Sequence, residues 1–364
     1  MGRDMNPTRM HAIMSGSERS LGASCTRLAL SCASLFYRAA IAARNAVFDS
    51  GLRKPVQLAR PVISIGNITS GGTGKTPLVM DLARRLLAMG AKPGILTRGY
   101  RGSAKADEAE RTSDEVELFR AEFGDVVPVE VNASRAAGAA RMLEKYPEIS
   151  VFLLDDGFQH RQVHRDVNIV LIDTTRPFGY ECMLPRGLLR EPVKNLRRAD
   201  VFILTRCNEV NASQLSAIEK RTKTKSENAV VHAEQHWREF KRSDNTTGEI
   251  NDLRRIPLFA FTGIGNPAAF EKMLRRHADD VRGVRAFPDH HAFTQAQVRA
   301  LMDEAKACGA QAMITTEKDW TKLQSLNDWS VSLLPLYRPV LRIEFPNAAE
   351  WHAIEAKIKM CLGK

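Results

Sequence analysis

The stretch TSGGTGKTP at residues 69–77 constrains the fold of this chain more than any other feature. Gly74, Lys75 and Thr76 fit the end of the P-loop pattern G-x-x-x-x-G-K-[ST], but Thr69 stands where the pattern has its first glycine. An apolar run, PVISIGN, precedes the stretch, and TPLVMDLARRLLAMG follows it with leucines at helical spacing. A Gly-rich turn between a strand and a helix can bind phosphate through backbone N–H groups and the helix dipole. The stretch therefore predicts a variant nucleotide-binding loop, and the alternative is a turn that only caps a helix.

Strand and helix patterns alternate over about residues 60–206. The runs SVFLLDDG, VNIVLID and ADVFILT are apolar without alternation, which is typical of strands that are buried on both faces of a parallel sheet. A second α/β pattern starts at IPLFAFTGIGNP. We therefore predict an α/β fold: a P-loop NTPase-like, doubly wound, mostly parallel sheet, and a second, smaller α/β domain, with a cleft between them.

The domain boundaries follow from these patterns. We expect residues 1–20 either to be disordered or to result from a misassigned start codon. The other parts are an amphipathic membrane-associating helix over 21–50, the P-loop domain over 51–207, a polar connection over 208–255, a second α/β domain over 256–340, and a C-terminal strand and helix over 341–364.

The early helical segment offers two interpretations. Its most apolar part, LALSCASLFY at residues 28–37, is far shorter than the about 20 residues that a membrane-spanning helix needs. On a helix, polar and basic residues form one narrow stripe, and apolar residues cover the rest. Such a helix either packs on the core of its own domain or lies in a membrane interface. The stripe consists of Arg27, Ser31, Ser34, Arg38 and Asn45.

The formal net charge of +11 suits nucleic acid, an anionic membrane surface or a phosphorylated substrate, and the charge alone does not choose among them. No zinc-finger pattern or RNA-binding aromatic motif supports a nucleic-acid partner. Six cysteines without a C-x-x-C pair disfavour a structural zinc site.

The second informative motif is LLDDGFQH at residues 153–160. An apolar strand that ends in acids resembles a Walker B motif, in which a carboxylate holds Mg²⁺. The alternative is an Asp-Asp-Gly turn without a metal, and His160 lines the same sheet edge or is a structural histidine.

Membrane-partitioning ATPases offer a rival reading of the loop. Their deviant P-loop reads K-G-G-x-G-K-[ST], and here Ser70 replaces its lysine. Serine cannot supply positive charge to a phosphate, so this replacement argues against that class.

The motifs taken together resemble the tetraacyldisaccharide 4'-kinase family over about residues 25–325. They are GNITSGGTGKTP, LTRGYRG, SDEVEL, DDGFQHRQVHRD, PFGYECMLPRGLLREP, FPDHHAFT and TTEKDWTK, in this order. The resemblance implies transfer of the ATP γ-phosphoryl group to the 4'-hydroxyl of an acylated glucosamine disaccharide 1-phosphate, giving lipid IVA. It also implies ATP and Mg²⁺ as cofactors and the cytoplasmic face of the inner membrane as the place of action. The basic charge and the early helix together predict peripheral or monotopic attachment to anionic lipid there, and we expect a monomer that binds no nucleic acid.

The resemblance also implies roles for individual residues. The catalytic residues would be Lys75, Asp114, Asp155 and His290, with Asp114 as the general base and His290 as its partner. The ATP contacts would come from Ser70, Gly71, Gly72, Thr73, Gly74, Lys75 and Thr76. The Mg²⁺ ligands would be Thr76, Asp156 and Glu191. The acceptor contacts would be Asn67, Tyr100, Gln159 and His160.

Two points about the pair Asp114 and His290 remain expectations. Asp114 is expected in the first domain and His290 in the second, so that domain closure would assemble the base. Ser113-Asp114-Glu115-Val116 departs from the family's G-D-E-P, which leaves the loop geometry open. TTEKD (315–319) has no chemical role that the residues indicate.

Overall fold

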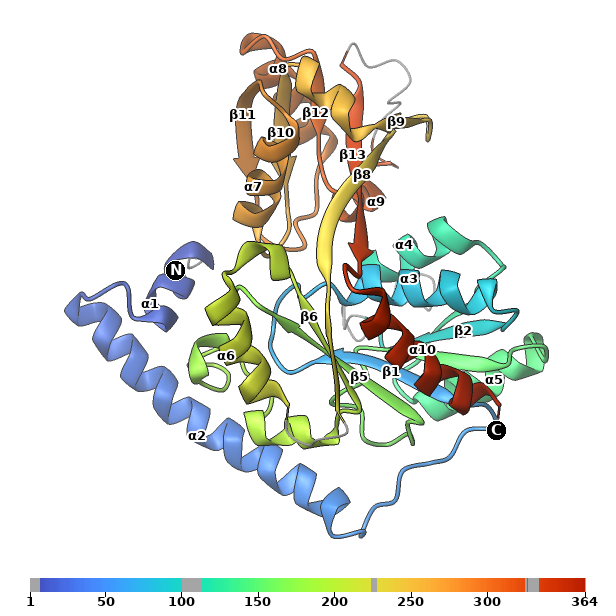
Figure 1. Ribbon diagram of the computed structural model, residues 1–364. Coiled ribbons are helices and arrows are strands. Elements are labelled where there is room, and N and C mark those ends of the chain that lie inside the picture. Colours follow the sequence, from blue (N-terminus) through green and yellow to red (C-terminus); the bar gives the residue numbers. More distant parts are fainter. Residues whose placement is uncertain (1–6, 100–112, 224–227, 325, 327–333, 364) are drawn as a thin grey trace. The chain divides into compact units, whose positions relative to one another are not determined.

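The computed structural model describes residues 7–99, 113–223, 228–324, 326 and 334–363 (Figure 1). The chain divides into two compact units. The first unit consists of Met1–Thr112, Phe119–Gln235 and Ile343–Lys364, and the second unit of Ser113–Leu118 and His236–Arg342.

The first unit is built on a seven-stranded sheet with the order β3-β2-β4-β1-β5-β6-β7. Neighbouring strands pair in parallel throughout. The predicted doubly wound fold is therefore confirmed. The strands are β1 (Val62–Asn67), β2 (Pro93–Thr97), β3 (Val129–Val131), β4 (Val151–Asp155), β5 (Val167–Asp173), β6 (Val201–Thr205) and β7 (Ala229–His232). The helices are α1 (Pro7–Ser15), α2 (Leu21–Asp49), α3 (Lys75–Ala88), α5 (Arg135–Lys145), α6 (Ala212–Thr222) and α10 (Ala348–Leu362), and α4 (Asp114–Phe123) belongs to both units.

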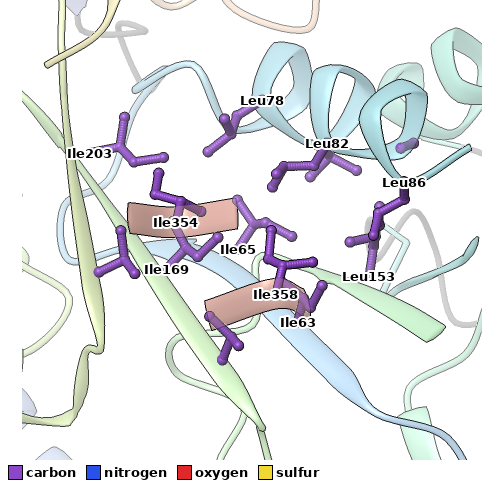
Figure 2. Packing of buried hydrophobic residues seen from close by; sticks show 14 of the residues in the cluster. Ile63, Ile65, Leu78, Leu82, Leu86, Leu153, Ile169, Ile203, Ile354 and Ile358 are labelled. Atoms are coloured by element: carbon purple, nitrogen blue, oxygen red, sulfur yellow. The ribbon is translucent and has the colours of Figure 1, made fainter. Parts of the chain in front are cut away.

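Helices α3 and α10 cover one face of this sheet. Leu78, Leu82 and Leu86 recur along α3 at helical spacing and are buried, and Figure 2 shows them facing the aliphatic side chains of the central strands. Ile354 and Ile358 of α10 enter the same cluster. The C-terminal helix thus completes the core of the P-loop unit.

The second unit contains a six-stranded sheet with the order β11-β10-β12-β13-β8-β9. Strands β10, β11, β12 and β13 pair in parallel, whereas β8 and β9 are antiparallel. The elements are β8 (Glu234–Arg242), β9 (Thr247–Glu249), β10 (Leu258–Thr262), β11 (Val281–Ala286), β12 (Ala312–Ile314), β13 (Leu336–Glu344), α7 (Pro267–His277), α8 (Gln295–Ala307) and α9 (Glu317–Leu323).

The structure differs from the expected boundaries in two places. Residues 208–255, expected to be a connection, contain α6, β7, β8, β9 and the 3-10 helix η5 (Ile250–Arg255). Part of the expected disordered start forms α1. The TTEKD motif opens α9, because the Thr316 hydroxyl accepts a hydrogen bond from the N–H of Asp319 at 3.0 Å and caps the helix.

Helix α2 packs on the rest of the first unit through a side that carries both polar and apolar residues. Tyr37 and Ile41 contact the core, and the hydroxyl of Ser34 donates to the carbonyl of Met183 at 3.0 Å. Among the described helices, including the 29-residue α2, none combines the length and hydropathy needed to cross a bilayer.

Candidate active site

The P-loop runs from the carboxyl end of β1 into α3. Gly71 and Gly74 have φ angles of 111° and 94°, a region that a glycine enters without strain. Thr69 instead forms a bridge with Leu189, and the N–H of Ser70 donates to the carbonyl of Leu188 at 2.7 Å. The chain is still in extended pairing at position 69, so the first glycine of the usual pattern is not required there.

Asn67 supports the loop from inside the protein. Its side-chain amide is buried and donates to the Thr73 hydroxyl at 2.9 Å, and the Thr205 hydroxyl donates to the Thr73 carbonyl at 3.0 Å. Gln159 donates to the carbonyl of Asn67 at 2.8 Å. These contacts direct Asn67 and Thr73 toward each other, whereas the resemblance implied acceptor contact for Asn67 and ATP contact for Thr73.

Arg206 is a loop-supporting residue that the motifs did not indicate. It directly follows β6, has a left-handed φ of 60°, and donates to the carbonyl of Gly72 at 3.0 Å. It also forms an ion pair with Asp173 at the end of β5 and donates to Gln235 at 3.1 Å. The sequence could have indicated Arg206 through its position directly after an apolar strand, because the carboxyl ends of the strands meet at one edge of a parallel sheet.

The acids of the Walker B-like motif lie beside the loop. Asp155 ends β4 opposite Ile65 of β1 and accepts a hydrogen bond from Thr97 at 3.2 Å. Asp156 has a left-handed φ of 50°, and its carboxylate lies 3.6 Å from Lys75 Nζ and 2.8 Å from the guanidinium of Arg190. Burial alone would raise the pKa of Asp156, but Lys75 and Arg190 outweigh it and hold the pKa below its usual value.

Thr76 and Asp156 fit a Mg²⁺ site. Mg²⁺ is usually held by one or two carboxylates together with substrate phosphates and water, and a P-loop hydroxyl is a common further ligand. In the described ranges, no group of three or more His, Cys, Asp or Glu side chains could hold a metal ion. Glu191 does not fit the set, because its side chain is fully buried and its carboxylate accepts hydrogen bonds from four side chains, whereas the Asp156 side chain is 39% exposed beside the loop. The four donors are Arg44, Asn45, Asn195 and Arg198.

His160 lies beside a cavity of about 200 Å³. Burial lowers the pKa of His160 to about 4, with help from nearby arginines, so its ring is neutral at physiological pH. Arg53 and Lys54 also line the cavity and make it basic. Tyr100, which the resemblance also assigned to the acceptor, lies outside the described residues.

Asp114 and His290 are brought together within the second unit. His290 Nδ1 lies 3.1 Å from Asp114 Oδ2, and His290 has a left-handed φ of 59°. Both residues therefore belong to one compact unit. We had expected them in two different domains, with domain closure bringing them together. The two residues share a unit because Ser113–Leu118, at the start of α4, groups with the second unit although the rest of α4 does not.

Two lysines of α9 complete this pair, and the sequence did not indicate them. Lys322 Nζ lies 2.9 Å from Asp114 Oδ2, and Lys318 Nζ lies 3.4 Å from His290 Nε2. An ammonium group can only donate, so with a neutral imidazole Nε2 accepts and Nδ1–H donates to Asp114. Burial alone would raise the pKa of Asp114, but hydrogen bonds from His290 and Lys322 outweigh it and lower the pKa.

The TTEKD motif positions these lysines. Asp319 is fully buried and accepts hydrogen bonds from the Thr262 hydroxyl at 2.9 Å and the Gly263 N–H at 3.1 Å. It thereby fixes the start of α9 to the carboxyl end of β10.

Comparison with known proteins decides the family. The model of the tetraacyldisaccharide-1-P 4'-kinase (LpxK) family matches residues 26–359. The chain belongs to this family. The tetraacyldisaccharide 4'-kinase of Geobacter sulfurreducens is 35% identical over 345 residues, which cover 91% of this chain and 93% of the relative. That of Syntrophus aciditrophicus is 37% identical over 311 residues, covering 80% and 82%.

A solved member of the tetraacyldisaccharide-1-P 4'-kinase family has the same fold. The crystal structure of Aquifex aeolicus LpxK in complex with ATP is 29% identical, with a TM-score of 0.69, and the match covers 93% of this chain and 99% of that one. Membership confirms the predicted activity: the chain is an ATP-dependent kinase that phosphorylates the 4'-hydroxyl of the tetraacyldisaccharide 1-phosphate in lipid A synthesis.

Proposed function

We propose that the phosphoryl transfer of this family is carried out here by two groups of residues with separate tasks. The backbone N–H groups of residues 70–76 bind the triphosphate of ATP at the start of α3. Lys75, which follows the left-handed Gly74, reaches the β- and γ-phosphates. The observation that carries this proposal is the convergence of Lys75 and Arg190 on Asp156 beside the loop.

Thr76 and Asp156 would hold Mg²⁺, and Asp155 precedes Asp156 at the end of β4. When bound, Mg²⁺ would supply positive charge to offset the negative charge that develops on the phosphates during transfer. The cations on Asp156 keep it ionised, which is the form that can bind the metal. Its left-handed backbone costs about 1 kcal/mol or more, as is common for residues held in place at functional sites.

Asp114 is the proposed general base for the 4'-hydroxyl. A sugar hydroxyl is a weak nucleophile, and a carboxylate within hydrogen-bond reach can take its proton as the new P–O bond forms. His290 orients Asp114 through the 3.1 Å contact. Lys322 keeps the carboxylate ionised before the proton arrives.

The test separates turnover from nucleotide binding. Asp114→Asn preserves the shape of the side chain and removes its capacity as a base, so we expect kcat to fall by about 10²-fold or more with little change in the Kd for ATP. Asp279→Asn is the matched control, because Asp279 is an acid of the same unit that pairs with Arg254 at 3.0 Å and has a side chain that is 65% exposed. Equal losses in kcat and ATP affinity for Asp114→Asn would refute the base role.

The acceptor is an acylated lipid, and α2 carries the features of a membrane-surface helix. Its outward face is apolar, with Leu28, Leu35 and Phe36 exposed by 68%, 65% and 80%. The spacing of three, four and seven residues along the helix makes this face one continuous stripe. The exposed stripe consists of Leu21, Cys25, Leu28, Cys32, Leu35, Phe36 and Ala39.

We propose that the occupant of this stripe is an anionic bilayer surface, to which the enzyme attaches without a spanning helix. The other side of α2, which carries both polar and apolar residues, contacts the protein and leaves the apolar stripe to the lipid. The net charge of +11 adds electrostatic attraction, since each Lys or Arg near such a surface contributes about 1 kcal/mol. The inner membrane's cytoplasmic face is the surface where this charge and the acceptor would meet.

Vesicle flotation tests the membrane proposal. With vesicles that contain phosphatidylglycerol, the full chain should float, and the double variant Leu28→Glu, Leu35→Glu should stay in the bottom fraction. Val126→Glu is the control, because Val126 is 64% exposed elsewhere on the same unit. Unchanged flotation of the double variant would show that another surface binds the membrane.

A further inference from the structure

One fully buried carboxylate joins α2 to the rest of the first unit. Glu191 has no exposed surface, and its Oε1 accepts a hydrogen bond from Arg44 of α2 at 2.7 Å. Its Oε2 accepts from Arg198 at 2.8 Å and from Asn195 at 2.6 Å, both on the 3-10 helix η3 (Val193–Arg198), and from Asn45 of α2 at 3.2 Å. A buried charge is stable only when it is paired and hydrogen-bonded in this way.

The residues just before Glu191 lie against the P-loop. The N–H of Arg190 donates to the carbonyl of Ile68 at 2.8 Å, and Leu188 accepts from the N–H of Ser70 at 2.7 Å. The hydroxyl of Tyr37, on α2, donates to the carbonyl of Arg190 at 3.1 Å. The Leu188–Glu191 segment is therefore held by α2 on one side and by the loop on the other.

Arg190 links this segment to Asp156, the proposed Mg²⁺ ligand. Its guanidinium donates to both carboxylate oxygens of Asp156, at 2.9 Å and 2.8 Å. Any shift of the Leu188–Glu191 backbone moves Arg190 relative to Asp156, because the two side chains meet through these bonds.

We propose that Glu191 is a positioning residue whose buried carboxylate fixes the Leu188–Glu191 segment between α2 and the P-loop, and thereby holds Arg190 on Asp156. This inference rests on the proposed role of Asp156. The resemblance implied that Glu191 binds the metal, whereas in this proposal Glu191 binds α2. It predicts that a residue on α2, which touches neither nucleotide nor metal, affects turnover.

The test compares both ends of the ion pair. Arg44→Ala and Glu191→Gln should each lower kcat by about tenfold or more, since small displacements of catalytic groups are costly. The Mg²⁺ concentration for half-maximal rate should change alike in both variants, because both loosen the contact of Arg190 with Asp156, the proposed Mg²⁺ ligand. Arg44→Lys should recover most of the rate, because the lysine can still pair with Glu191.

Arg197→Ala is the matched control. Arg197 also joins η3 to α2, through Asp49 at 3.3 Å, but its side chain is 63% exposed and such pairs contribute little. It should keep the rate of the unmodified enzyme.

Hydrogen exchange gives a readout that is independent of activity. The amides of Leu188–Glu191 should exchange faster in Arg44→Ala and Glu191→Gln than in Arg197→Ala. If Glu191→Gln does not fold, the Arg44 variants carry the test. An increased Mg²⁺ requirement in Glu191→Gln with an unaffected Arg44→Ala would overturn the proposal and return Glu191 to the metal site. Unchanged exchange in Arg44→Ala would overturn it as well, whatever the role of Asp156.

Discussion

The buried bond between Asn67 and Thr73 offers a sharp test of how the P-loop is held. Both side chains are nearly inaccessible, with 0% and 3% exposed, and their 2.9 Å hydrogen bond joins the last residue of β1 to the loop. Asn67→Ala leaves the Thr73 hydroxyl without this partner, and an unsatisfied buried polar group costs about 1–3 kcal/mol. If all of this loss falls on ATP binding, the Kd for ATP rises by about five- to 150-fold.

A double-mutant cycle measures the bond itself. Asn67→Ala, Thr73→Val and the double variant are compared by urea unfolding and by ATP titration. We expect the sum of the two single effects to exceed the effect of the double variant by about 1 kcal/mol. The KM for the acceptor should stay unchanged. If Asn67→Ala instead raises only this KM, with unfolding and ATP affinity intact, then Asn67 binds the acceptor and our reasoning about the loop is wrong.

Two further predictions concern pH. Lys322→Met removes a cation that lowers the pKa of Asp114, so the acid-side fall in kcat/KM should move to higher pH; an unmoved profile would exclude Asp114 as the titrating base. Burial alone would lower the pKa of His232, but hydrogen bonds to Glu350 and Glu219 outweigh it and raise the pKa. A raised folded-state pKa stabilises the fold fully below the unfolded value of about 6.5, and this stability is lost as pH rises through the folded value. His232→Asn should therefore flatten the pH dependence of urea unfolding above about pH 6.5, and an unaltered dependence would contradict this.

The central strands could be predicted because their environment leaves a strong mark on the sequence. β4, β5 and β6 are buried on both faces, so every position favours an apolar residue and the runs are continuous. The loop motif could be recognised because glycines, a lysine and a hydroxyl are needed at fixed spacing.

Strand β8 was missed for the opposite reason. Its sequence EQHWREFKR buries Gln235, Trp237 and Phe240, so only two of the inward residues are apolar and the charged residues dominate the pattern. Helix α9 was missed because its seven residues begin within a polar motif and are too few to show a helical period.

The supporting contacts of the site could not be read from the sequence. Arg44 and Glu191 are 147 positions apart, and Arg206 and Gly72 are 134 apart. No spacing rule connects residues at such separations, because the fold brings them together. The resemblance alone attached Glu191 to the metal, whereas its hydrogen bonds attach it to α2.

The most direct measurement is phosphoryl transfer from γ-labelled ATP to the tetraacyldisaccharide 1-phosphate in detergent micelles with Mg²⁺, using the full chain. We predict that label appears on the lipid at its 4'-hydroxyl, and that Lys75→Ala abolishes it. Label released only as inorganic phosphate, with none on the lipid, would contradict the account and indicate a P-loop ATPase of another kind.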